Sequence, residues 1–208
     1  MKNNVQESWE NFLNPKVMRP LLITASIYIT AFESLKESII GRIRDFYIMP
    51  LFEADEESKK NYNEKVLSRN KSPLYASLDW LKENGVIEDK DIQALDDVKE
   101  CRNALAHDLF KKISTNEFPD LESRFQAMLE LLNKIEIWWI VNVEIATDPD
   151  FDDSEIDESK IQPGPVMVLK MMIDVALGDE ATASYYYEEF KKKTGANQSE
   201  QDNPITRP

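Results

Sequence analysis

The segment Arg102–His107 holds the residues of this chain best suited to acid–base chemistry. It reads Arg-Asn-Ala-Leu-Ala-His and contains the only histidine in the 208-residue sequence. An imidazole exchanges protons near neutral pH, and a guanidinium binds phosphate oxygens through a planar set of N–H donors. Asn103 is either a surface residue or a group that orients the imidazole. Arg102, Asn103 and His107 are therefore candidate catalytic residues for phosphodiester chemistry.

The spacing of these residues matters if the segment is helical. Successive helical residues are about 100° apart, so Arg102 and His107 point about 140° apart, whereas Asn103 and His107 share a face. A two-fold dimer would resolve this by placing two copies of each side chain around one cleft. A structural interpretation stays open, in which Arg102 pairs with Asp96 or Asp97 and His107 stabilises the last helical turn.

The elements around this segment are predicted to be helices, because apolar residues recur at steps of three and four. The predicted helices run from Pro20 to Pro50, from Ser72-Pro73 to Gly85, from Asp89 or Asp91 through Leu109, from near Asp120 through Val143, from Val166 to Gly178, and through Tyr185–Tyr187 to Lys193. Arg102 falls on the apolar stripe of the third, where a charge needs a partner. The sequence thus predicts an all-α, up-and-down bundle of four to six helices.

The length favours one helical domain, residues 1–194, with a core bundle over about 20–145. The charged segment 53–71 is expected to be a solvated connection that can be partly helical, and 147–162 an acidic loop. Helices should occupy 163–194. The tail 195–208 lacks apolar anchors apart from Ile205 and is expected to be disordered.

Metal and cofactor sites find little support in the sequence. Cys101 is the only cysteine, which excludes an internal disulfide and a cysteine zinc site. An EF-hand loop starting at Asp148 would place Asp153 where glycine is required and Ser159 where glutamate is required. We therefore expect no cofactor and no metal.

Two apolar segments suggest contacts beyond a single helix face. Residues 135–143 are apolar almost all the way round, so they should pack against more than one neighbour. We expect the apolar surface that one bundle cannot cover to form a homodimer interface. Tyr185–Tyr187 are adjacent to Glu188 and Glu189, which favours packing or partner contact over stacking on nucleic-acid bases.

The formal net charge of −14 argues against a general nucleic-acid coat or an anionic-membrane binder, but a small basic pocket remains compatible with it. The first 14 residues have no apolar core of a secretory signal. The apolar run 21–32 is too short to span a bilayer. These features predict a cytoplasmic protein with no membrane contact.

The Arg102–His107 segment also resembles the motif of the HEPN superfamily (higher eukaryotes and prokaryotes nucleotide-binding). Four residues separate the arginine from the histidine, a polar residue follows the arginine, and the setting is helical. The resemblance covers about residues 20–145 as a helix pattern and 102–107 as a motif. It implies a dimerising bundle of four or five helices and, in active members, a metal-independent endoribonuclease of toxin–antitoxin, abortive-infection and CRISPR-associated systems.

Transferred position by position, the resemblance makes Arg102 the group that steadies the scissile phosphate and His107 the general acid or base. Asn103 is then the polar companion in the motif. The first hypothesis is an RNA-cleaving homodimer in bacterial defence or stress response, with an antitoxin or another protein as a further partner. The alternative is a non-catalytic helical module that binds a nucleotide or a protein. The acidic composition and the long segment after residue 146 depart from the short family core.

Overall fold

The computed structural model describes residues 2–48, 55–115, 120–149 and 156–201. These residues form an all-α protein without strands, as predicted, although its helices outnumber the expected four to six. The α-helices are α1 (Lys2–Leu13), α2 (Pro15–Tyr47), α3 (Glu56–Lys65), α4 (Pro73–Glu83), α5 (Asp89–Thr115), α6 (Leu121–Trp139), α7 (Gly164–Leu177) and α8 (Glu180–Gln201).

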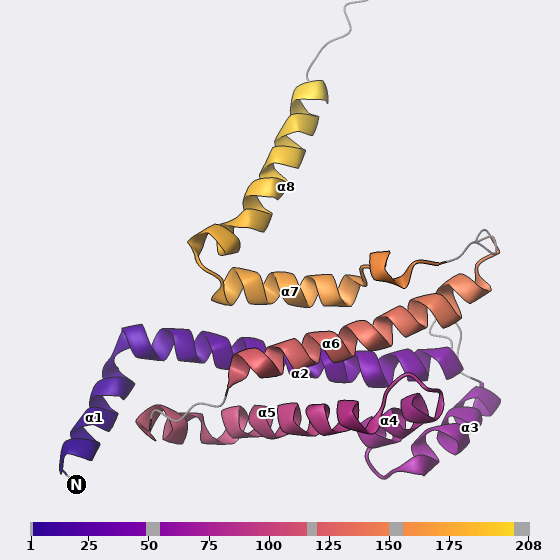
Figure 1. Ribbon diagram of the computed structural model, residues 1–208, viewed down its shortest axis with the longest axis horizontal. Helices are drawn as coiled ribbons and strands as arrows, with labels where there is room; N and C mark the ends of the chain where they lie inside the picture. The colour runs from indigo at the N-terminus through magenta and orange to yellow at the C-terminus, as the bar shows by residue number, and fades with distance from the viewer. Residues whose placement is uncertain (1, 49–54, 116–119, 150–155, 202–208) are drawn as a thin grey trace, which may run out of the picture.

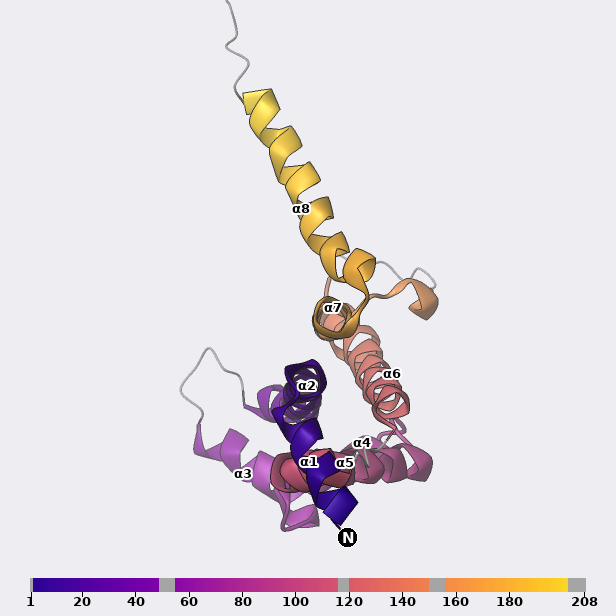
Figure 2. The same cartoon turned by 90° about the vertical axis from the view of Figure 1, so that its left-hand side faces the viewer.

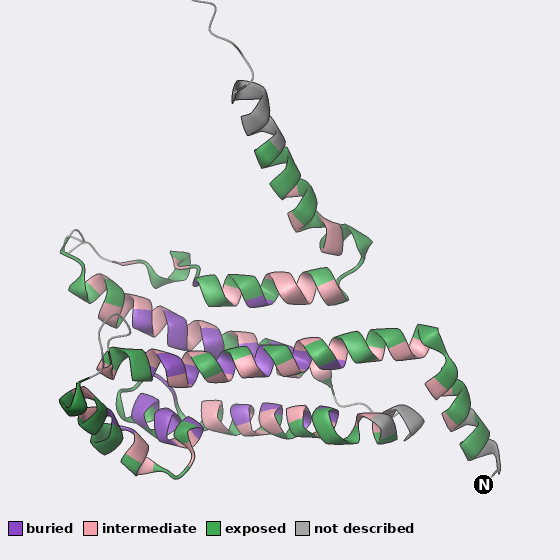
Figure 3. Ribbon diagram, turned by 180° about the vertical axis from the view of Figure 1, so that it is seen from behind, coloured by how far each residue is buried: buried purple, intermediate pink, exposed green. Residues whose placement is uncertain are grey.

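Three long helices, α2, α5 and α6, lie side by side and enclose most of the core (Figures 1 and 2). Helix α4 closes one end against α2, and α1 packs across α2 and α5 at the other end. Helix α7 covers α2 and α6, whereas α8 projects away from the bundle. Figure 3 shows the buried residues concentrated on the facing sides of the central helices. The core includes Tyr28, Leu35, Ile39, Leu81, Leu105, Met128 and Ile135.

Helix α2 begins earlier than the sequence pattern predicts. Asn14 caps it by accepting a hydrogen bond from the backbone N–H of Lys16 at 3.0 Å, and Pro15 takes the first helical position. The predicted start, Pro20, lies inside the helix instead. A proline there removes one backbone hydrogen bond but does not end the helix.

The segment 53–71, predicted as a solvated and in part helical connection, is helical over much of its described part but is not fully solvated. It contains α3, which is capped by Asp55 through a 2.6 Å hydrogen bond from Ser58 N–H, and a short 3₁₀ turn, Leu67–Arg69. Tyr62 and Val66 are buried against the body. Two anchors are enough to dock a helix whose other residues are charged or polar, and they are too few to show a periodic stripe.

The apolar run 135–143 is covered within one chain. Ile135 and Trp139 are buried, while Trp138 and Val143 pack against the core. The Trp139 indole stacks on that of Trp80 with ring centroids 5.9 Å apart. The expected contact with several neighbours is thus present, but the surplus surface invoked for a homodimer is filled by the chain itself.

The C-terminal part follows the predicted order of loop and helices. In the acidic loop the structure describes a 3₁₀ turn, Glu158–Lys160, while residues 150–155 lie outside the described part. Helix α8 extends to Gln201, beyond the predicted start of the tail at residue 195. Glu and Gln are good helix formers, which accounts for this extension.

Candidate functional site on helix α5

Arg102 lies near the middle of α5, on the side that faces α2. Its Nη2 atom is 2.5 Å from Oε1 of Glu33, and its guanidinium sits over the Phe32 ring at 5.7 Å. The expected partners are wrong, because Asp96 accepts a hydrogen bond from Tyr75 and Asp97 one from Gln93. The arginine is therefore paired as its apolar position requires, but with a carboxylate from another helix.

Asn103 links Arg102 to the adjacent face of α5. Nη1 of Arg102 donates to Oδ1 of Asn103 at 3.3 Å. Adjacent side chains leave a helix about 100° apart, but the arginine side chain is long enough to bring its guanidinium back to this neighbour. Asn103 itself is exposed. The guanidinium consequently lies between its half-buried partner Glu33 and the open face of the helix.

His107 is exposed one turn after Asn103, on the same face of α5. The helix continues to Thr115, so the interpretation of His107 as a residue that stabilises the last turn is wrong. Within the described part of the chain, no hydrogen bond or ion pair engages its imidazole. The imidazole is therefore open to solvent and to a ligand.

The charge of Arg102 is partly balanced by Glu33. This carboxylate also accepts a hydrogen bond from Lys36 at 3.0 Å. The Lys36 hydrogen bond, with a further one from Arg102, outweighs partial burial and lowers the pKa of Glu33. Arg102 keeps 28% of its side-chain surface exposed, so N–H donors remain accessible to an anion.

Sequence reasoning located Arg102, Asn103 and His107 but missed Glu33. The sequence feature that could have indicated Glu33 is its position directly after the core residue Phe32, because a carboxylate next to buried positions needs a cationic partner. Only the packing of α2 on α5 shows that this carboxylate meets Arg102. The described chain thus brings Glu33, Arg102 and Asn103 together and leaves His107 one turn away.

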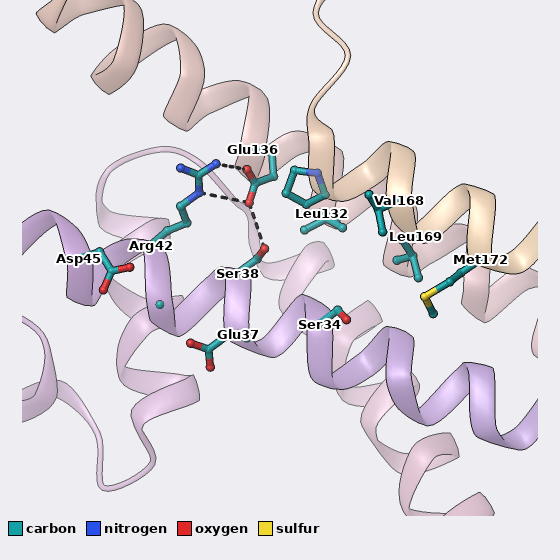
Figure 4. A pocket seen from close by; sticks show the side chains of 12 residues that line it. Ser34, Glu37, Ser38, Arg42, Asp45, Leu132, Glu136, Val168, Leu169 and Met172 are labelled. Atoms are coloured by element: carbon teal, nitrogen blue, oxygen red, sulfur yellow. Dashed lines mark hydrogen bonds and ion pairs between the residues drawn. The ribbon is translucent and has the colours of Figure 1, made fainter. Parts of the chain in front are cut away.

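A second charged cluster lies in a cleft of about 600 Å³ between α2, α6 and α7 (Figure 4). Glu136 is fully buried there and accepts hydrogen bonds from Ser38 Oγ at 3.0 Å and Arg42 Nη2 at 2.5 Å. Arg42 Nη1 also reaches Glu144 at 2.8 Å. Because the one guanidinium of Arg42 bridges Glu136 on α6 and Glu144 in the segment that follows α6, this cluster is a structural tie between α2 and that part of the chain.

Comparison of the chain with protein-family models, with curated proteins and with solved structures gives no match. The described residues contain no group of three or more His, Cys, Asp or Glu side chains that could hold a metal ion. In the same residues, each helix is too short or too polar to cross a bilayer.

Proposed function

We propose that this chain is a HEPN-type, metal-independent endoribonuclease that acts as a homodimer in bacterial defence, toxin–antitoxin or stress response. The observation that carries the proposal is the arrangement on α5. Arg102 is held by Glu33 and directed toward Asn103, while His107 is exposed on the Asn103 face. The resemblance of the segment to the HEPN motif supplies the reaction class.

The reaction would begin with attack of a ribose 2′-hydroxyl on the adjacent phosphorus. His107 of one copy accepts the hydroxyl proton, and the bond between 2′-oxygen and phosphorus forms. The bond from phosphorus to the 5′-oxygen then breaks, and His107 of the second copy protonates the leaving oxygen. Arg102 stabilises the negative charge that builds on the phosphate. The products are a 2′,3′-cyclic phosphate and a 5′-hydroxyl.

RNA must approach a chain whose net charge is −14, so local positive charge matters. Lys111 is exposed one turn after His107 and shares the face of Asn103 and His107. Lys36 adds a second cation beside Glu33. These lysines would attract a phosphate backbone to the His107 face.

The test compares purified wild type, His107→Gln and Glu100→Gln on single-stranded RNA in EDTA. Glu100 is an exposed residue of the same helix and serves as the matched control. We expect wild type and Glu100→Gln to release fragments with 2′,3′-cyclic phosphate ends, and His107→Gln to lose at least about a hundredfold in rate. Intact RNA with wild type, or full cleavage by His107→Gln, would refute the proposal.

A second candidate function is a non-catalytic helical module that binds a nucleotide or a protein. The observation in its favour is that Glu33 already pairs with Arg102, as expected for a purely structural arginine. On this alternative no RNA cleavage exists to lose. Arg102→Lys would then affect the free energy of unfolding alone, since the pair with Glu33 would be its only role.

A further inference from the structure

Helix α8 leaves the bundle with its apolar side chains uncovered. It packs on α7 and projects away from the other helices (Figures 1 and 2). Tyr185, Tyr187 and Phe190 are 58%, 61% and 65% exposed. At about 100° per residue, Tyr187 and Phe190 lie about 60° apart on one side of the helix and form an apolar surface typical of partner contact, whereas Tyr185 points to the opposite side.

The direction of α8 is fixed by contacts at its base. Tyr186 Oη donates to Asp174 Oδ2 of α7 at 2.7 Å, and Asp179 Oδ1 caps α8 by accepting from Thr182 N–H at 2.8 Å. At Gly178 a Cβ atom would lie 2.4 Å from the carbonyl oxygen of Asp174, so only glycine permits this turn. The exposed aromatics of α8 are thereby held away from their own bundle.

A groove that matches α8 in chemistry lies between α6 and α7. We name it the α6–α7 groove; it has a volume of about 850 Å³ and is lined by Leu121, Glu122, Phe125, Gln126, Ile173 and Asp174, among others. Its lining combines apolar side chains with the carboxylates of Asp120, Glu122 and Asp174 and with one cation, Lys170. The groove also includes Leu177 and Gly178, so it ends where α8 departs.

The α8 surface complements this groove in both polarity and charge. Tyr187 and Lys191 are four residues apart and share a side of the helix, with the Lys191 ammonium 5.2 Å from the Tyr187 ring centroid. Phe190 lies beside them. Tyr187 and Phe190 would pack on the apolar part of the lining, and Lys191 would meet Glu122 in a groove whose three carboxylates outnumber its one lysine.

We propose that α8 is an exchange arm, which docks in the α6–α7 groove of a second copy of this chain while the second copy returns its own arm. The occupant is a second copy because one sequence supplies both complementary surfaces and the fixed turn keeps them apart within one molecule. Reciprocal docking gives a closed two-fold dimer. The proposed ribonuclease also requires a dimer; this inference adds the surfaces that join the two copies and does not depend on the cleavage chemistry.

The test is a cross-link between differently tagged full-length chains. One carries Phe190→Cys and the other Gln126→Cys; both positions are exposed, while native Cys101 is buried. The control pairs Phe190→Cys with Lys60→Cys on α3, at a side chain that is 71% exposed. We expect the arm–groove disulfide to form at least about tenfold faster than the control. Equal rates, or dominant Phe190→Cys self-pairing, would overturn the proposal.

A charge exchange gives a second, independent readout. Glu122→Lys and Lys191→Glu should each shift wild-type dimers toward monomers in sedimentation at tens of micromolar, and the double variant should restore the dimer. Circular dichroism checks that each variant folds. A monomeric wild type would overturn the arm exchange. RNA cleavage is assayed on the same samples, so loss of the arm contact with cleavage retained would separate this proposal from the ribonuclease proposal.

Discussion

Arg102 and Glu33 form an ion pair between α5 and α2, with Nη2 and Oε1 2.5 Å apart across 69 residues of sequence. Besides this pair, the guanidinium contacts the face of the Phe32 ring and makes a longer hydrogen bond to Asn103, so Glu33 provides its shortest contact and helps to set its direction. Glu33 is thus a positioning residue for the proposed phosphate-binding arginine, and it does not need to touch RNA.

The first prediction tests this positioning with Glu33→Gln. The amide can still accept a hydrogen bond but no longer holds the guanidinium by charge, so we expect cleavage to fall about tenfold or more. The free energy of unfolding should change by about 1 kcal/mol or less, because Glu33 is 39% exposed. Glu37→Gln, one turn later on α2, is the control. Unchanged cleavage in Glu33→Gln would remove the positioning role.

The second prediction concerns the pair of Arg42 and Glu136. Arg42→Met leaves the fully buried Glu136 without its cation, and we expect a loss of about 3 kcal/mol in the free energy of unfolding. Adding Glu136→Met should recover most of it, because the unpaired charge is then gone. Urea titration measures both. Arg44→Met, at a residue 47% exposed, should change stability by about 0.5 kcal/mol or less.

The third prediction concerns pH. Burial opposes ionisation of Asp91, but the hydrogen bonds from Lys134 Nζ at 2.6 Å and Glu88 N–H outweigh it and lower the pKa of Asp91. A carboxyl whose folded pKa is depressed stabilises the fold above its unfolded pKa of about 3.9. That stabilisation is lost as pH falls through the folded pKa.

Thermal unfolding between about pH 6 and pH 3 should therefore show a steeper acid loss in wild type than in Asp91→Asn. Asp89→Asn provides the control, since that side chain is 84% exposed. Identical acid profiles for wild type and Asp91→Asn would contradict the assignment.

The fourth prediction compares two glycines. Gly85 has a φ of 71° after α4, with open space where a Cβ would lie. Gly85→Ala should cost about 1 kcal/mol through the backbone alone. Gly164→Ala, at the start of α7, also meets open space but has no positive φ, so it should be neutral or slightly stabilising. Differential scanning calorimetry of both variants measures this contrast; equal effects would argue against the backbone cause.

Elements governed by local signals could be predicted from the sequence. Ser72-Pro73 and Gly85 bracket α4 as expected, because proline at the first helical position and a positive φ depend on neighbouring residues alone, although the Ser72 side chain makes no capping hydrogen bond. For α3 the sequence allowed a helix but did not indicate its docking, since this depends on Tyr62 and Val66 meeting a surface distant in sequence.

The same distinction applies to the candidate site. The Arg102–His107 segment could be recognised because it is continuous in sequence. The partner of Arg102 could not be recognised in the same way. Asp96 and Asp97 are closer along the chain, and no local feature distinguishes Glu33 from other surface acids. Tertiary packing of α2 on α5 decides that choice.

The aromatic cluster at the α4 end of the bundle gives the protein a built-in optical reporter. Three of its four tryptophans, Trp80, Trp138 and Trp139, have ring centroids within 6.1 Å of one another, whereas Trp9 on α1 is 58% exposed. Coupled indoles give an exciton signal in far-ultraviolet circular dichroism, while an exposed indole such as Trp9 emits at longer wavelength in the folded and the unfolded chain alike. Separation of α4 from α6 would thus be seen in the unlabelled chain as loss of the exciton signal, against a nearly constant contribution from Trp9.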